Sequence, residues 1–131
     1  GWAGILLRSP DAVLAADPDA GRRRGIKVGL VATYPQGSRA DGVAAEVRAF
    51  YSDGREFAED PVTGSLNAGL AQWLVPAGHL PPTYVAAQGT VIHREGRVHV
   101  DVADGEVWVG GDTRTIFTGH LPTPKRSETD Q

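Results

Sequence analysis

The residues best suited to chemistry in this sequence lie in the run EDPVTGS, which begins at Glu59 and ends at Ser65. Two carboxylates, Glu59 and Asp60, precede the turn Thr63-Gly64-Ser65. If a helix begins at this turn, its first backbone amides lack intrahelical partners, and the helix dipole places partial positive charge there. Gly64 permits a ligand to approach the backbone, and the hydroxyls of Thr63 and Ser65 can bind a ligand or cap the helix. The pattern predicts a site for a carboxylate or a phosphate, with a plain helix cap as the alternative.

The helix that would present this turn is predicted over residues 65–75. Its only strongly polar side chains are Asn67 and Gln72, and a helix that is apolar nearly all round is typically buried. Gly69 costs about 1 kcal/mol of helix propensity relative to alanine, and we expect close packing against a sheet to compensate. We therefore predict a central helix wrapped by sheet, with its N-terminus open to the site.

The other elements predict an α+β fold with a mixed or largely antiparallel curved sheet or barrel around this helix. Before the turn we predict a strand at residues 4–8, a short helix at 11–16 with Ser9 as its N-cap, and strands at 26–34 and 44–51. After the helix we predict a hairpin at Asp104-Gly105 and strands at residues 84–87, 97–102, 106–109 and 113–118. We predict that residues 1–121 form one domain and that residues 122–131 form a polar tail.

Arg48 lies in the strand just upstream of the acidic pair. Strand alternation divides the side chains of residues 44–51 into two sets, with Ala45, Val47 and Ala49 on one face and Glu46, Arg48 and Phe50 on the other. We expect Arg48 to pair with Glu59 or Asp60, either as a structural ion pair or in the site.

The composition fits a single domain and excludes several classes of function. The chain has 131 residues, 40% of them hydrophobic, and a net charge of −3. We therefore expect no nucleic-acid partner, and no apolar run is long enough to span a membrane. The chain has no cysteine, which excludes thiolate chemistry and suits a cytoplasmic location. Its four histidines show no metal-ligand spacing, so we expect no metal site. Because no methionine opens the sequence, we expect a processed product or a piece of a longer protein.

A set of motifs in this sequence closely resembles the C-terminal half of the PhzF family. The motifs are Arg48-Ala49-Phe50, EDPVTGS, Gln88-Gly89, Arg94, Gly96-Arg97-Val98, Val107 and Gly110-Gly111. These are phenazine-biosynthesis-like proteins of the diaminopimelate epimerase fold. The resemblance runs from about the first strand to Leu121, so it implies one lobe of that fold. Family members consist of two similar lobes around a cleft, each a curved sheet or barrel around a central helix.

The resemblance also implies a chemistry, namely cofactor-free isomerisation or epimerisation of a small acid by proton transfer. In the phenazine enzyme the acid is of the dihydro-hydroxyanthranilate type. Asp60 would line the cleft and transfer a proton or bind a substrate amine; its alternative is a structural role. Thr63, Gly64 and Ser65 would bind the substrate carboxylate, with Arg48 and Glu59 in support.

The chain departs from the family pattern in one respect that matters for function. The family's principal acid/base glutamate and its Gly-His motif lie in the N-terminal lobe, and no residue here corresponds to them. His93 stands where relatives often have glycine, and we assign it no catalytic role. One hypothesis is therefore an isomerase lobe that a second lobe completes. Its alternatives are a stand-alone binding module, possible as a homodimer, and a relative kept for association alone.

Overall fold

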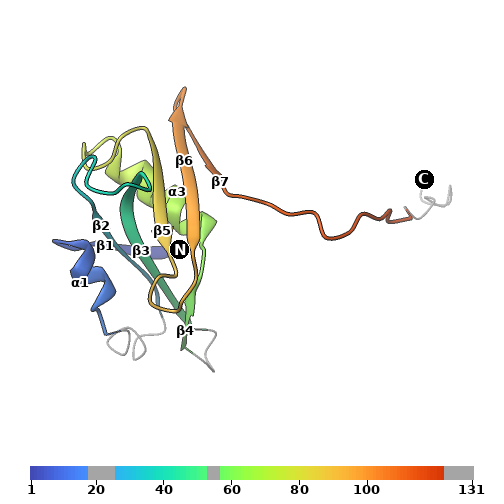
Figure 1. Ribbon diagram of the computed structural model, residues 1–131, viewed down its shortest axis with the longest axis horizontal. Helices are drawn as coiled ribbons and strands as arrows, with labels where there is room; N and C mark the ends of the chain where they lie inside the picture. The colour runs from blue at the N-terminus through green and yellow to red at the C-terminus, as the bar shows by residue number, and fades with distance from the viewer. Residues whose placement is uncertain (18–25, 53–56, 123–131) are drawn as a thin grey trace, which may run out of the picture.

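The fold is organised around one curved sheet with a helix on each side (Figure 1). The computed structural model describes residues 1–17, 26–52 and 57–122. Together these residues form a seven-stranded sheet. Its main path runs β1 (Trp2–Leu6), β2 (Lys27–Thr33), β3 (Val43–Ser52), β5 (Thr83–Gln88), β6 (Gly96–Ala103) and β7 (Glu106–Gly110). The strand β4 (Phe57–Asp60) pairs with the end of β3. Because β1–β2 and β3–β5 are parallel and the other pairs antiparallel, the sheet is mixed, as predicted.

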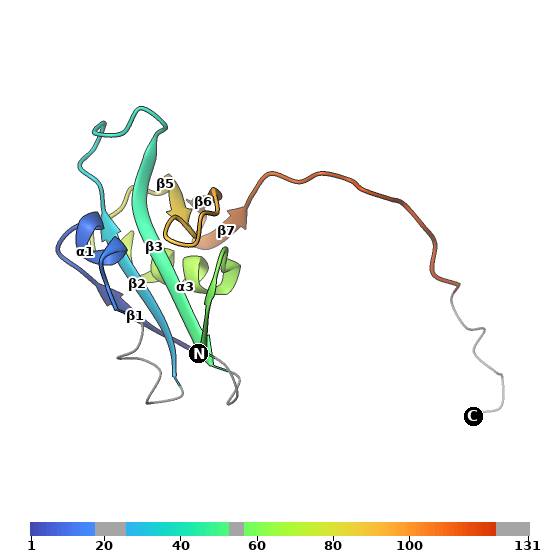
Figure 2. The ribbon, with the colours of Figure 1, turned by 60° about the horizontal axis from the view of Figure 1, so that its bottom comes forward.

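The two faces of the sheet carry separate cores. The helix α3 (Gly64–Leu74) lies inside the curve, and the short helix α1 (Pro10–Leu14) lies on the outer side (Figure 2). Alternate residues of β3 point to the two helices: Ala45, Val47 and Ala49 share a cluster with α3, whereas Phe50 shares one with Val13 of α1. The predicted alternation of this strand is therefore confirmed.

The predictions of α1 and of the last hairpin, which rest on a few neighbouring residues, are confirmed. The Ser9 hydroxyl caps α1 by accepting a hydrogen bond from the Ala12 amide at 3.2 Å. Asp104 and Gly105 both adopt positive φ angles, 53° and 81°, as a two-residue hairpin turn requires.

Two strand predictions need correction. We predicted no strand at residues 57–60, where β4 forms because the end of β3 offers a free edge. We predicted a strand at residues 113–118, but this segment pairs with no strand of residues 1–17, 26–52 and 57–122. Most of the predicted polar tail, residues 123–131, lies outside the described residues.

The helix α3 is not enclosed on all sides, contrary to our expectation. Leu66, Leu70 and Leu74 are buried against the sheet, but Gly69 is exposed and Trp73 keeps 45% of its surface accessible. A half-barrel covers only one side of a helix, so apolar composition alone overestimated the burial.

Close packing is achieved by glycines of the sheet and not by Gly69. A Cβ built on Gly69 meets no atom within 4 Å. A Cβ built on Gly29 of β2 would overlap the Leu66 side chain, and one on Gly4 of β1 would lie 3.3 Å from Leu70 Cδ2. The helix therefore approaches β1 and β2 because these strands lack side chains at the points of contact.

We expect Gly69→Ala to stabilise the fold by about 0.5–1 kcal/mol, because alanine restricts the unfolded chain and meets nothing in the folded one. Gly29→Ala is the matched contrast and should destabilise by about 1–3 kcal/mol through overpacking against Leu66. Urea denaturation of both variants measures the difference. A loss of stability in Gly69→Ala would show that its face is covered.

Candidate functional site

The passage from β4 into α3 separates the two carboxylates of the EDPVTGS run. In the antiparallel pairing of β4 with β3, Asp60 lies opposite Ala49 and Glu59 lies opposite Phe50. Ala49 packs in the α3 core and Phe50 in the α1 core. Asp60 therefore lies on the side of α3, beside its N-terminus, and Glu59 lies on the other side of the sheet.

The N-terminus of α3 is not capped by a side chain. Thr63 is the N-cap residue, but its hydroxyl makes no capping hydrogen bond. It donates instead to Asp60 Oδ2 at 2.7 Å. The next two residues, Gly64 and Ser65, are exposed. Their amides have no intrahelical acceptor, because the first bond of the helix runs from the Asn67 amide to the Thr63 carbonyl. The Thr63 hydroxyl therefore does not cap the helix but holds the Asp60 carboxylate beside helix amides that have no side-chain cap.

The fully buried side chain of Gln88 holds the turn between β4 and α3 through four hydrogen bonds. Gln88 Oε1 accepts hydrogen bonds from the Thr63 amide at 3.1 Å and from Asn67 Nδ2 at 2.9 Å. Its Nε2 donates to the Asp60 carbonyl and to Thr63 Oγ1, both at 2.9 Å. One side chain therefore satisfies groups on both sides of the turn and sets the direction of the Thr63 hydroxyl toward Asp60.

Asn67 and Ser65 complete the polar groups of this helix end. Asn67 Nδ2 also donates to the Thr63 carbonyl at 2.9 Å, while its buried Oδ1 has no hydrogen-bond partner among the described residues. The Ser65 hydroxyl accepts a hydrogen bond from Trp2 Nε1 at 3.1 Å. Because that bond uses a lone pair of Ser65, its hydroxyl proton remains free to point toward a ligand.

Two glycines explain why the Gln88-Gly89 and Gly96 motifs accompany the turn. A Cβ on Gly89, whose φ is +85°, would lie 2.9 Å from the Pro61 carbonyl oxygen and 2.8 Å from Arg94 Cβ. A Cβ on Gly96 would lie 2.9 Å from the same oxygen and 2.6 Å from Val62 Cγ2. Only glycine leaves room for the loop 89–96 to support the start of the turn.

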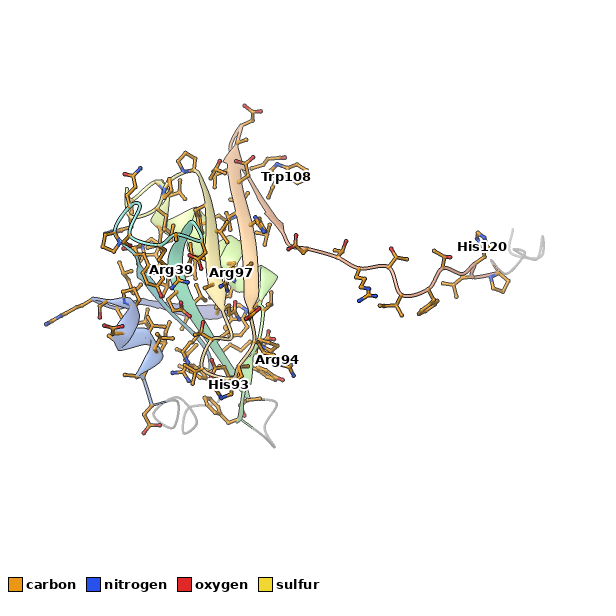
Figure 3. The ribbon with its side chains drawn as sticks, viewed as in Figure 1. Arg39, His93, Arg94, Arg97, Trp108 and His120 are labelled. Carbon is orange, nitrogen blue, oxygen red and sulfur yellow. The ribbon has the colours of Figure 1, made fainter. Side chains whose placement is uncertain are left out.

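His93 and Arg94 project from this supporting loop. Figure 3 shows both residues at the end of the molecule where β4 lies. His93 has a φ of 58°, a conformation that glycine adopts readily. The structure thus shows that the backbone at position 93 adopts a conformation in which glycine would be unstrained.

Arg48 and Glu59 form a buried ion pair on the outer side of the sheet. Arg48 Nε and Nη2 donate to the two Glu59 oxygens at 3.0 and 2.8 Å. Arg48 Nη1 donates to three carbonyls at the end of α1, those of Val13, Leu14 and Ala16, at 2.9 to 3.2 Å. The predicted pairing of Arg48 with Glu59 is confirmed. This geometry joins α1 to the sheet, and it lies across the sheet from Asp60.

Sequence reasoning missed roles for Trp2, Asn67 and Gln88. Asn67 carried a usable signal, because it is one of two strongly polar residues in an apolar helix. Gln88 was noticed as part of a motif, but its partners lie more than twenty positions away in the chain. Trp2 carried no local signal at all, because its contact with Ser65 spans 63 positions.

Two hollows among the described residues lie away from this helix end. One, of about 470 Å³, is lined by residues that include Tyr34, Arg39, His79 and Tyr84. Another, of about 590 Å³, adjoins Tyr84 and Trp108. Asp60, Thr63, Gly64 and Ser65 line neither of them. Within the described residues, the N-terminus of α3 is therefore not part of either hollow, and Gly64 and Ser65 are exposed there.

We predict that the free energy of unfolding depends on pH through Tyr84, which lines both hollows. Burial raises its pKa to about 12. Since the folded pKa exceeds the unfolded value near 10, the contribution of Tyr84 to stability is complete below about pH 10 and is lost as the pH rises toward about 12. Over this range the wild type should lose about 2–3 kcal/mol more unfolding free energy than Tyr84→Phe. Urea denaturation across the range tests this, and parallel profiles would contradict it.

The described part of the chain contains neither a group of metal-ligating side chains nor a helix able to span a membrane. Within residues 1–17, 26–52 and 57–122, no three His, Cys, Asp or Glu side chains are grouped so that they could hold a metal ion. In the same residues, no helix has the length and apolar character that crossing a membrane requires.

Comparison with known proteins agrees with the resemblance seen in the motifs. The family model of the phenazine biosynthesis-like proteins (PhzC-PhzF) matches residues 2–120. A crystal structure of the Bacillus anthracis phenazine biosynthesis protein of the PhzF family is similar to 81% of this chain, with a TM-score of 0.57 and 19% sequence identity. The aligned part is 40% of that protein, so this chain spans about two-fifths of its length. No curated protein matches the chain. The structural likeness confirms the predicted α+β fold class.

Proposed function

The chain belongs to the phenazine biosynthesis-like (PhzC-PhzF) family, and from this membership we propose that it is one lobe of a cofactor-independent isomerase or epimerase. The proposed reaction is proton transfer on a small cyclic or amino-acid-like carboxylate. A cytoplasmic location is part of the proposal, on the ground that the chain lacks cysteine.

One observation carries this proposal: an oriented carboxylate stands beside an uncapped helix N-terminus. The Thr63 hydroxyl holds Asp60 Oδ2 at 2.7 Å, and Thr63 is itself held by the buried Gln88. Gly64 and Ser65, whose amides have no intrahelical acceptor, are exposed residues at the positive end of an 11-residue helix. Helix ends of this kind favour carboxylates.

In this proposal the helix N-terminus and Asp60 act on different parts of a bound acid. The substrate carboxylate accepts hydrogen bonds from the Gly64 and Ser65 amides and from the Ser65 hydroxyl. Asp60 Oδ1, which has no hydrogen-bond partner among the described residues, faces the neighbouring part of the substrate. There it transfers a proton or binds the amine. Because one Asp60 oxygen is already bonded to Thr63, the direction of the other is set before a ligand arrives.

A second lobe is needed to complete the site. The helix end lies outside the hollows described above, and no residue of this chain corresponds to the family's principal acid/base glutamate. We propose that a separate N-terminal half or a second copy of this chain supplies the opposite wall. A lobe that binds the acid without turnover, as a homodimeric binding module, is the alternative outcome.

Titration of the isotope-labelled chain with a dihydro-hydroxyanthranilate tests the binding step. We expect the amide resonances of Gly64 and Ser65 to shift most, since these groups would donate to the carboxylate. Ser65→Ala should weaken binding by about tenfold, because a hydrogen bond to a charged group is lost. Ser38→Ala, an exposed serine in a distant loop, serves as the matched control.

A titration with the methyl ester of the same acid distinguishes recognition of the carboxylate from non-specific binding. It should leave the Gly64 and Ser65 resonances in place, and equal shifts with acid and ester would refute the anion site. Turnover is tested in D2O with the completed assembly. Deuterium should enter the substrate at carbon, and Asp60→Asn should abolish this exchange. Binding without exchange would identify a binding module.

A further inference from the structure

The segment after β7 exposes large apolar side chains more fully than any other part of the described residues does. Residues 111–122 run away from the sheet as an extended strand-like segment (Figures 1 and 2). Ile116, Phe117 and Leu121 are 80%, 86% and 94% exposed. His120 marks the far part of this segment in Figure 3. We call residues 113–121 the donor segment.

The composition of the donor segment is that of a strand without a sheet. Thr113, Thr115 and Thr118 flank the pair Ile116 and Phe117, and β-branched and aromatic residues of this kind are favoured in strands. Neighbouring residues of a strand point to opposite faces. Ile116 and Phe117 therefore require apolar cover on both faces, which an added strand at the edge of a curved sheet receives.

The open edge of β1 offers this cover. Among the described residues β1 pairs with β2 alone, so its outer backbone groups are unpaired. On the inner face, the half-exposed ring of Trp73 packs over Gly4. On the outer face, Ile5 keeps 45% of its surface accessible. An acceptor edge with apolar side chains on both faces matches a donor with Ile116 and Phe117 in succession.

We propose that two copies of this chain exchange their donor segments, each adding residues 113–121 as a strand along β1 of the other. The donor segment of each copy runs away from its own body in both views (Figures 1 and 2), which presents it to a partner. A two-fold arrangement uses the same donor and the same acceptor twice. Three large apolar side chains per copy then leave water, and one open sheet edge per copy is closed. This inference does not depend on the chemistry proposed above.

Sedimentation equilibrium of the full chain tests the exchange. We expect a dimer for the wild type and a monomer for Ile116→Asp/Phe117→Asp. These tail substitutions remove no packing within one copy, because both side chains are exposed. Thr113→Asp adds charge to the same segment without removing an apolar group and should remain dimeric. Ile5→Asp blocks the acceptor and should also be monomeric.

Mixing provides the decisive measurement. A chain ending at residue 111 keeps its acceptor and lacks a donor, whereas Ile5→Asp keeps its donor and lacks an acceptor. Each should be monomeric alone, and together they should form a one-to-one complex. In that complex the amides of residues 113–121 of the Ile5→Asp chain should become protected from hydrogen exchange. A monomeric wild type, or a dimer that survives removal of the segment, would overturn the proposal. So would a protected segment in a monomer, which indicates closure on its own sheet.

Discussion

Gln88→Leu is expected to lower the free energy of unfolding by about 3–5 kcal/mol, because the substitution leaves several buried polar groups without partners. Leucine preserves most of the volume but cannot accept from the Thr63 amide and Asn67 Nδ2 or donate to the Asp60 carbonyl. Each buried group left unpaired costs about 1–3 kcal/mol. Because these groups lie on both sides of the turn, the orientation of Asp60 should be lost as well.

Urea denaturation measures the loss of stability, and amide resonances of Gly64 and Ser65 report the change in the turn. Gln72→Leu is the matched control, since it makes the same chemical change at an exposed glutamine of α3. It should alter stability by no more than about 0.5 kcal/mol. Equal effects of the two substitutions would show that the Gln88 hydrogen bonds do not hold the turn in solution.

Arg48→Met should destabilise the protein by about 3–5 kcal/mol, the usual result of removing one partner from a buried ion pair. Arg48 and Glu59 side chains are 4% and 9% exposed. Without the guanidinium, Glu59 keeps a buried charge with its main partner removed, and three carbonyls at the end of α1 lose their donor. The effect should appear as loss of α1 docking as well as lower global stability.

A double substitution separates the charge from the packing. Arg48→Met with Glu59→Gln should recover part of the stability, because no uncompensated charge then remains buried. Arg39→Met breaks the partly exposed ion pair with Asp41 and should cost no more than about 1 kcal/mol. If Glu59→Gln gives no recovery in the Arg48→Met background, the ion pair is not the origin of the loss.

Binding should respond differently to these two substitutions. Gln88 contacts the turn that presents Gly64 and Ser65, whereas Arg48 acts on the opposite side of the sheet. Under conditions where both variants are folded, Gln88→Leu should weaken binding of the acid and Arg48→Met should leave it nearly unchanged. This difference distinguishes a support of the proposed site from a support of the fold.

The sequence by itself determined the elements whose signals lie within a few residues. The start of α3 within the turn Thr63-Gly64-Ser65, the Ser9 cap of α1, the hairpin at Asp104-Gly105 and the two-sided pattern of β3 were all predicted and observed. The motifs that resemble the PhzF family also lie in continuous runs. Helix capping, turn conformation and strand alternation depend on neighbouring residues, so a single chain read in order contains them.

Only the tertiary structure decided what covers each face and which distant groups meet. It placed Asp60 and Glu59 on opposite sides of the sheet, gave Gln88 its four hydrogen bonds and left Gly69 and Trp73 of α3 exposed. It also left residues 113–118 without a strand to pair with. These outcomes depend on contacts between segments far apart in the chain, and a strand or a buried helix face exists only where a partner surface is present.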